Sequence, residues 1–395
     1  MSHLDLDILW SLEWGPPVFK NTMSKNRFKE IIKYLRFDLK STRNTRLSTD
    51  KFAMISDIWN NFIENCQMCY IPGENMTVDE QLFPSKTRCP FLQYIANKPD
   101  KFGIKFWLLV DVESKYLCGG FPYLGKDSER LSNMSLPEHV VMKLLQPYLK
   151  KGRNVTTDNF FTSLKLAEKL RSESTSIDGT MRRARREVPA NCRNIRTKRY
   201  ETFILKSATN TTLTIYQGKP GKNVIVLSTL HENIHIDAES KKKLPETIQF
   251  YNETKVGVDI IDQMARKYTV RAGTRRWPVH VFYNILDLAA INSWIIYRQV
   301  TGENISRHNY ILQLVSELRA EYVNKKQSAS AFQRLDNITI EEEQPSTSQK
   351  RRQCQINSKC KKNRTCDLCT ICQKAVCGQC VKKVFKKIIC NKCFM

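Results

Sequence analysis

The 395-residue chain contains three short stretches whose carboxylates could hold a metal ion. Asp79 and Asp158 each end a β-prone run, and Asp259 and Asp262 lie three residues apart in a stretch that predicts a helix, where they share one face. An aspartate at a strand end is most often a turn former or a helix cap, so each stretch alone is a weak signal. Together, in a strongly basic chain, the three stretches predict carboxylates that converge on divalent metal.

The chemistry of such a site would be phosphoryl transfer assisted by two metal ions. Aspartate oxygens are the hard ligands that Mg²⁺ or Mn²⁺ prefers, and three or four carboxylates can hold two ions roughly 3.5–4 Å apart. One ion then activates a water or a 3′-hydroxyl, and the other stabilises the leaving oxygen. We therefore expect two Mg²⁺ (or Mn²⁺) ions as cofactors.

The charge of the chain indicates a polyanionic partner. Lys and Arg number 64 and Asp and Glu 39, which gives a formal net charge of +25. Nucleic acid is the first candidate, and a basic protein without such a partner is the alternative. The dense run from Arg182 to Arg186 fits contact with the DNA backbone, or equally a solvated loop or a localisation signal.

No membrane association is expected. The start of the chain shows no signal peptide, because it lacks a basic stretch followed by a long apolar core. The longest apolar region, residues 281–300, contains Asn284, Asp287 and Asn292. These polar residues predict a buried helix instead of a membrane span.

Cysteines are concentrated at the end of the chain. Of the 14 cysteines, nine fall between Cys354 and Cys393, and in a chain without a secretion signal such clusters indicate metal ligands sooner than disulfides. The spacing is a strong zinc pattern: Cys369-x2-Cys372-x4-Cys377-x2-Cys380 and Cys390-x2-Cys393. From Lys350 on, this tail is densely basic with Asp367 as its only acid, which favours contact with phosphate.

The succession of elements predicts an α/β fold. Apolar residues at helix spacing indicate helices within residues 1–70, and the long apolar run 102–111 is typical of a central strand. A hairpin to residues 116–121, a helix over 137–149, the run ending at Asp158 and a helix over 163–170 follow. This order predicts a mixed sheet flanked by helices. Short alternating segments in 178–250 predict a small β-rich insertion, and the polar segment 325–350 has the composition of a linker.

At these residues the chain resembles the piggyBac family of DNA transposases. The motifs that carry the resemblance occur in the family's order and cover nearly the whole chain from about Trp10. They are Thr77-Val78-Asp79-Glu80-Gln81-Leu82, Arg88-Cys89-Pro90-Phe91, Asn97-Lys98-Pro99-Asp100-Lys101-Phe102-Gly103-Ile104-Lys105, Pro122-Tyr123-Leu124-Gly125, Thr157-Asp158-Asn159-Phe160-Phe161-Thr162-Ser163, Tyr251-Asn252-Glu253-Thr254-Lys255, Gly257-Val258-Asp259, Asp262-Gln263-Met264, Arg276-Trp277-Pro278 and the cysteine-rich tail.

The resemblance implies an RNase H-like catalytic domain that is interrupted by the β-rich insertion, with a helical N-terminal segment and a C-terminal cross-brace zinc domain. The expected divisions are 1–70, a helical segment for dimerisation and DNA binding; 71–178, the first part of the catalytic domain; 179–250, the insertion; 251–324, the last part of the catalytic domain; 325–350, the linker; and 351–395, the zinc-binding domain.

The resemblance also implies the reaction and the site. The metal-binding residues would be Asp79, Asp158 and Asp259, with Asp262 as a catalytic auxiliary, and the family excises an element and inserts it at TTAA in double-stranded DNA. We accordingly expect a nuclear protein that binds transposon ends as a homodimer. The residues expected near DNA are Arg88, Lys98, Asn159, Ser163 and Trp277. Trp277 would stack on a displaced base, or would be a core tryptophan.

For the tail, the resemblance implies a cross-brace that holds one to two Zn²⁺ ions and binds DNA. The expected ligands are Cys354, Cys360, Cys369, Cys372, Cys377, Cys380, Cys390 and Cys393. The family's domain opens with a Cys-x2-Cys pair, whereas Asn357 stands here at the second position. Cys360 or Cys366 could substitute, so one of the two sites depends on which of them is recruited.

Two other classes of protein compete with an active transposase. One is a domesticated, non-mobile DNA-binding or chromatin protein, and the other is an interaction module of the RING or PHD type on an inert scaffold. The complete set of aspartates favours the enzyme, and the basic tail favours DNA over a protein partner. The chain begins partway into the family's N-terminal region, so we expect that activity could depend on upstream sequence.

Overall fold

The structure is a computed structural model that describes residues 4–125, 132–193, 198–237, 239–338, 351–357, 360, 363–384 and 387–390. The chain divides into two compact units, Met1–Val323 and Asn324–Met395, and each is treated by itself below. The first unit contains the sheet that carries the aspartates, and the second contains the cysteine-rich tail.

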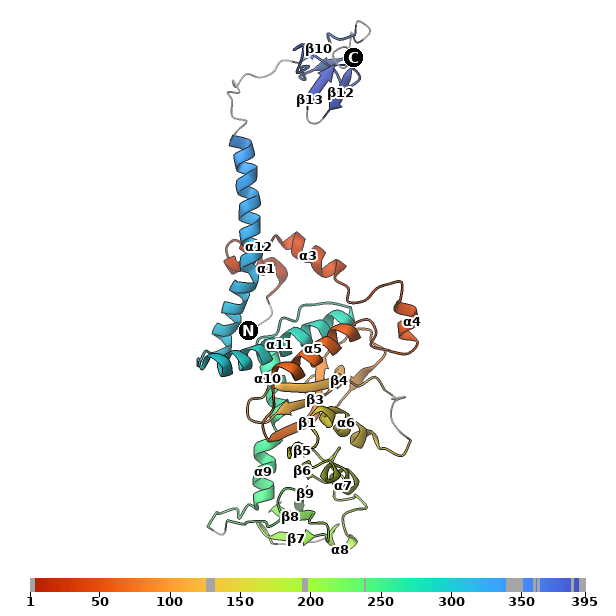
Figure 1. Ribbon diagram of the computed structural model, residues 1–395, viewed down its shortest axis with the longest axis vertical. Coiled ribbons are helices and arrows are strands. Elements are labelled where there is room, and N and C mark those ends of the chain that lie inside the picture. The colour runs from red at the N-terminus through yellow and green to blue at the C-terminus, as the bar shows by residue number, and fades with distance from the viewer. Residues whose placement is uncertain are drawn as a thin grey trace. The chain divides into compact units, whose positions relative to one another are not determined.

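A mixed sheet forms the centre of the first unit (Figure 1). Five of its strands follow the order β4-β3-β1-β5-β6, in which β1 runs parallel to β5, β5 parallel to β6, and β3 antiparallel to both β1 and β4. Their bounds are β1 Asn75–Pro84, β3 Phe102–Asp111, β4 Leu117–Pro122, β5 Asn154–Thr157 and β6 Ser176–Thr180, and the short β2, Leu92–Tyr94, pairs with the start of β3. The apolar run 102–111 is a buried strand, as its composition predicted.

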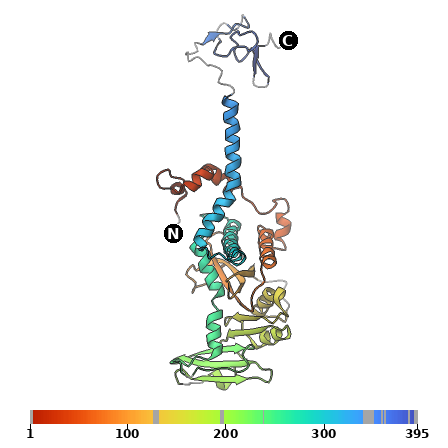
Figure 2. The ribbon, with the colours of Figure 1, turned by 60° about the vertical axis from the view of Figure 1, so that its left-hand side comes forward.

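The insertion extends this sheet. Strand β9 (Lys222–Ser228) pairs antiparallel with β6, and β8 (Thr212–Lys219) and β7 (Thr202–Lys206) follow it outward. Figure 2 shows these three strands, in green, as one continuous ladder. Gly221 makes the turn between β8 and β9 with φ +71°, a conformation that favours glycine. The short helix α8, Ala190–Arg193, precedes the ladder.

Helices cover both faces of the sheet. Gln81 and Phe106 lie opposite each other on β1 and β3 and therefore share a face. That face packs against α5 (Ser56–Cys69), α10 (Gly257–Lys267) and α11 (Trp277–Thr301), and the indole of Trp59 on α5 stacks on Phe106 with the ring centroids 4.6 Å apart. The opposite face carries Trp107, which packs edge-on against Phe161 just before α7 (Leu164–Ser172). Helix α6 (Leu136–Leu145), with the 3₁₀ turn Gln146–Tyr148 after it, also packs on β3.

Four short helices precede α5. They are α1 Leu6–Leu9, α2 Pro17–Thr22, α3 Lys25–Tyr34 and α4 Arg43–Leu47. The ring of Trp10 packs against Phe19 and Phe28 at centroid distances of 5.3 and 5.1 Å. Arg276, which precedes α11, donates a 2.8 Å hydrogen bond to the carbonyl of Leu35 and a second to that of Ile32. The end of α3 is thereby fastened to the catalytic part of the unit.

Helix α11 is long and apolar enough to cross a membrane by length and composition. In this protein it is a core helix, because most of its apolar window is buried. Its amides are buried with it: Asn292 accepts a 2.9 Å hydrogen bond from the backbone N–H of Leu117 and donates one of 3.0 Å to the carbonyl of the same residue. The polar residues within the apolar stretch thus serve internal hydrogen bonds, as the sequence predicted.

The second unit is small. Helix α12 runs from Arg307 to Ile338, so residues 325–338 of the expected linker are helical, and 339–350 lie outside the described residues. The tail forms two short hairpins, β10 (Arg352–Gln353) with β11 (Arg364–Thr365) and β12 (Val381–Val384) with β13 (Lys387–Cys390). Cysteines together with Ile356 and Val376 make up its buried centre. A core of that composition is too small to hold the tail together by apolar burial alone.

Candidate active site and cysteine cluster

Asp79 and Asp158 lie side by side on neighbouring parallel strands. Val78 of β1 pairs with Thr157 of β5, and each aspartate is the next residue along its strand direction. Both side chains are partly buried. Asp158 leaves the strand in a turn in which its Oδ1 accepts a 2.9 Å hydrogen bond from the backbone N–H of Phe160. The parallel register therefore brings two of the three predicted metal ligands to one edge of the site.

The two carboxyl groups are held in an environment that disfavours their charge. Burial raises the pKa of Asp79 well above its usual value, and the charges of Glu80 and Asp158 raise it further. Burial likewise raises the pKa of Asp158, against the opposing effect of the Phe160 N–H. Neighbouring carboxyl groups that repel each other and are short of counter-charge fit a site that binds a cation.

Asp259 approaches from the helix that packs on the same strand. Helix α10 begins at Gly257, where a Cβ atom would lie 3.2 Å from the Thr77 side chain, a tight contact, so glycine favours this close approach. Farther along, Gln81 of β1 hydrogen-bonds to Asp262 of the helix at 3.1 Å. Thr77, Asp79 and Gln81 alternate onto one face of β1. Strand β1 and helix α10 therefore touch at Thr77 with Gly257 and at Gln81 with Asp262. Asp79 lies between these two contacts on the strand. The exposed Asp259 lies between them on the helix.

The three aspartates are not drawn into one tight cluster. Among the described residues, only the cysteines of the tail bring three or more potential ligand atoms within 4.8 Å of one another. A two-metal site does not require such closeness, because ligands of different ions are separated by the distance between the ions. In the arrangement seen here Asp79 is central, with Asp158 on one side and the helix of Asp259 on the other. By donor type these carboxylates suit hard divalent ions, and their grouping around metal stays a prediction.

Asp262 differs from the other three acids, because both of its oxygens are engaged by protein. Oδ1 accepts from Gln81 at 3.1 Å, and Oδ2 accepts from Nε of Arg266 at 2.9 Å. Arg266 also donates to Asp100 at 2.6 Å. The lone pairs that would serve a metal ion are thus directed at hydrogen-bond donors.

Sequence reasoning missed a lysine beside the carboxylates. Lys105 lies on β3 with its Nζ 3.8 Å from the ring centroid of Trp107 and 4.0 Å from Oε2 of Glu80, while Lys98 lies 3.9 Å from the other oxygen of Glu80. Burial lowers the pKa of Lys105, and the charges of Glu80 and Asp79 oppose that shift. The signal that could have found it is a lone lysine inside an otherwise apolar strand.

The residues expected near DNA have varied surroundings. Asn159 accepts a 2.9 Å hydrogen bond at Oδ1 from Nε of Arg182, and Oγ of Ser163 caps α7 by accepting from the N–H of Leu166. Arg88 is exposed in the loop after β1, and Lys98 is paired with Glu80. The Arg182 contact brings the basic run next to Asp158, and DNA contact by these residues stays a prediction.

Trp277 lies in the core. Its side chain is 8% exposed, stacks on Phe52 at 5.7 Å between ring centroids, and meets Phe91 edge-on at 5.0 Å. A nucleotide base could stack on this ring only after those neighbours moved. DNA contact by Trp277 therefore stays a prediction.

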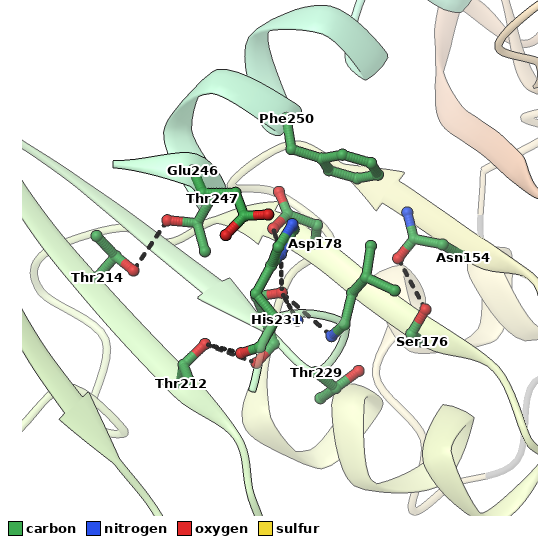
Figure 3. Close-up of polar contacts among 12 residues, drawn as sticks. Asn154, Ser176, Asp178, Thr212, Thr214, Thr229, His231, Glu246, Thr247 and Phe250 are labelled. Carbon is green, nitrogen blue, oxygen red and sulfur yellow. Dashed lines mark hydrogen bonds and ion pairs between the residues drawn. The ribbon is translucent and has the colours of Figure 1, made fainter. Parts of the chain in front are cut away.

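A buried polar cluster joins the insertion to the catalytic sheet (Figure 3). Asp178 of β6 pairs across the strands with Ser228 of β9, and Nδ1 of His231 lies 3.0 Å from the Ser228 hydroxyl and 3.5 Å from the Asp178 carboxylate. Burial raises the pKa of Asp178, and His231 opposes the shift. Because β6 also pairs with β5, this cluster fixes the insertion relative to Asp158.

The tail contains a four-cysteine cluster. The Sγ atoms of Cys354, Cys360, Cys377 and Cys380 all lie within 4.8 Å of one another, and those of Cys360 and Cys380 are 3.5 Å apart. Four thiols at this separation match tetrahedral zinc. Cys360 thus takes the position that Asn357 leaves open, and the exposed Cys366 stands outside the cluster.

The second expected zinc site is only partly described. Cys369 is buried and Cys372 half-buried. Cys390 ends β13, but its side chain and the whole of Cys393 lie outside the described residues. The grouping of these four cysteines remains a prediction.

Comparison with known proteins identifies the class. A family profile described as "Transposase IS4" matches residues 1–294. A piggyBac transposase, solved in a synaptic complex with hairpin DNA, superposes with a TM-score of 0.78 and 33% identity, covering 99% of this chain and 84% of that one. The sheet and helices are thus those of a DDE transposase, and the predicted fold class is confirmed.

Two human relatives indicate the same class of protein. The chain is 25% identical over 299 residues to the Homo sapiens piggyBac transposable element-derived protein 3 and 21% identical over 301 residues to protein 2 of that series, in each case over 70% of this chain. It spans about half the length of these relatives, 48% and 49%. The protein belongs to the piggyBac family of transposases.

Proposed function

We propose that this protein is a metal-dependent DNA strand transferase that cuts and joins double-stranded DNA at TTAA. The observation that carries the proposal is the placement of Asp79 and Asp158 on adjacent parallel strands, with α10 bringing Asp259 along the same seam. The repulsion between the two strand carboxyl groups supports a role in holding cations.

In this mechanism Asp79, Asp158 and Asp259 would hold the metal ions through their carboxylate oxygens. The bound ions would supply the charge that activates the attacking oxygen and stabilises the leaving one. The chain's own contribution is geometric: the β1–β5 register sets the spacing of two ligands, and the close approach at Gly257 sets the third. Lys105 and Lys98, both near Glu80, offset part of the negative charge of these carboxyl groups.

We further propose that the protein binds DNA in the nucleus as a homodimer and that its tail contacts the element's ends. The net charge of +25 and the basic tail support a DNA partner, and the solved relative was captured in a synaptic complex with hairpin DNA. Zinc in the four-cysteine cluster would be structural, because all four positions of a tetrahedral site are filled by protein thiols.

A second function is a DNA-binding protein that no longer mobilises DNA. Support for it comes from the human relatives, whose names describe them as element-derived proteins. The two functions differ in one measurable respect, strand cleavage that requires divalent metal.

The test is cleavage of a labelled duplex that carries TTAA at the junction with sequence taken from beside the gene. The purified chain is incubated with Mg²⁺ or Mn²⁺, alone and after extension by upstream coding sequence. Nicks at TTAA that disappear with EDTA would support the transferase. Tight binding without nicks in either form would favour the DNA-binding protein.

A further inference from the structure

A chain of polar side chains crosses the interior next to the candidate metal site. Asn284 of α11 donates a 2.9 Å hydrogen bond from Nδ2 to Oε1 of Gln81 on β1. Gln81 in turn donates from Nε2 to Oδ1 of Asp262 on α10 at 3.1 Å. Arg266 holds the other oxygen of Asp262 and, through Asp100, the segment before β3. Two helices, a strand and a loop are linked by these four consecutive bonds.

The middle of this chain is sealed from solvent. Gln81 is 1% exposed and Asn284 is fully buried. Burying an amide costs free energy unless its hydrogen bonds are made, and apolar side chains would fill the same space without that cost. Both functional atoms of the Gln81 amide are used, which fixes its orientation. Such a network gives up some stability and in return holds one precise arrangement.

The arrangement that it holds is the one between two candidate metal ligands. Gln81 lies two residues beyond Asp79 on the same face of β1, and Asp262 lies three residues beyond Asp259 on α10. A shift of α10 along β1 would break the bond between Gln81 and Asp262. The network therefore fixes the position of Asp259 on α10 relative to Asp79 on β1.

We propose that Gln81, together with Asn284, is a positioning residue that sets Asp259 against Asp79, and that Asp262 acts as a strut in this network and not as a metal ligand. The inference rests on the proposed two-metal site. Residues that hydrogen-bond a metal ligand directly influence affinity about 10- to 100-fold. Gln81 and Asn284 act through the placement of α10, so a loss near the lower end of that range is expected when the network is cut.

The experiment measures Mn²⁺ binding by electron paramagnetic resonance on the zinc-loaded full chain. Asp79→Asn supplies the baseline, since it removes a ligand of the site. Gln81→Met keeps length and volume but removes both hydrogen bonds, and Asn284→Leu cuts the same network from the helix. The matched control is Asn292→Leu, which deletes another buried amide of α11 that bonds only to Leu117 and Cys66.

The expected result is a fall in Mn²⁺ affinity of about 10-fold or more in Gln81→Met and Asn284→Leu, with Asn292→Leu within about 2-fold of wild type. Wild-type Mn²⁺ affinity in both Gln81→Met and Asn284→Leu would overturn the inference. So would an equal loss in all three, because general loosening of α11 would then explain it.

A further variant separates the strut from a ligand and guards against failure of the others to fold. Asp262→Asn keeps its shape and can still accept from Gln81. If Asp262 is a strut, this variant retains Mn²⁺ binding with a loss no greater than that of Gln81→Met. Complete loss, as in Asp79→Asn, together with normal binding by Gln81→Met would make Asp262 a ligand and overturn the inference. Wild type that binds no more Mn²⁺ than Asp79→Asn would instead refute the metal site itself.

Discussion

The hydroxyl of Thr269 donates a 2.6 Å hydrogen bond to Oδ2 of Asp287, and the N–H of Val270 donates to Oδ1 at 2.8 Å. These bonds tie the segment that follows α10 to the middle of α11. Burial raises the pKa of Asp287 to about 6, although both bonds favour the carboxylate. The link between the helix of Asp259 and the core helix therefore depends on a carboxyl group that titrates in a mild pH range.

The raised pKa of Asp287 predicts that mild acidification stabilises the folded protein. A pKa that is higher in the folded than in the unfolded protein means that the folded protein holds the proton more tightly. The contribution of Asp287 to the free energy of unfolding is therefore fully present below about pH 4 and is lost as the pH rises through about 6. Relative to Asp287→Asn, wild type should gain about 1–2 kcal/mol in free energy of unfolding between pH 8 and pH 5. Urea titrations followed by tryptophan fluorescence report this, because all six tryptophans lie in the first unit. A difference that does not vary with pH would show that another group titrates.

Replacing Asp158 should separate catalysis from DNA binding. Asp158→Asn removes the charge of a metal ligand with little change of shape, so cleavage at TTAA should fall by at least about 1,000-fold while DNA affinity changes less than about 3-fold. Gel-based cleavage and fluorescence anisotropy measure the two quantities. Asp237→Asn, at an exposed aspartate of the insertion, is the matched control and should cleave normally. Cleavage by Asp158→Asn at the wild-type rate would refute the assignment.

The four-cysteine cluster predicts which thiol is essential for zinc. Wild type should contain one to two Zn²⁺ per chain, and Cys360→Ser should contain one fewer, whereas Cys366→Ser should match wild type because Cys366 lies outside the cluster. Inductively coupled plasma mass spectrometry of the purified full chain gives the stoichiometry. Equal zinc in Cys360→Ser and wild type would mean that another residue serves as the ligand.

DNA binding should depend steeply on salt, because phosphate contacts by lysine and arginine release counterions. Removing residues 351–395 should lower the slope of log affinity against log salt and weaken binding to the element's own ends more than to random duplex. Anisotropy titrations between about 50 and 200 mM salt provide both values. Equal loss on the two duplexes would show that the tail contributes charge without recognition.

Local patterns in the sequence carried much of the fold. The apolar run 102–111 and the β-prone runs leading to Asp79 and Asp158 could be assigned to strands because strand identity is set by neighbouring residues. The prediction that the first run ends at Asp79 was wrong, because β1 continues to Pro84. Asn284, Asp287 and Asn292 correctly separated a core helix from a membrane span.

The features of the site that could not be predicted from the sequence depend on residues far away in the chain. The engagement of Asp262 requires Gln81, which is 181 residues away. The burial of Trp277 is decided by Phe52 and Phe91, and no pattern around residue 277 reports on them. Spacing permits both Cys360 and Cys366, and only the tertiary structure shows that Cys360 joins the cluster. Such tertiary choices are beyond periodicity and composition.

The same separation has a consequence for biosynthesis. When β1 leaves the ribosome, the helix that will cover its Asp79 face lies 181 residues behind it. At 5–20 residues per second, the ribosome needs about 10–35 s to deliver that helix. Throughout this interval Phe106 and its neighbours on the nascent sheet have no cover from α10 or α11. The nascent chain therefore exposes an apolar surface of the kind that chaperones protect until α10 and α11 are made.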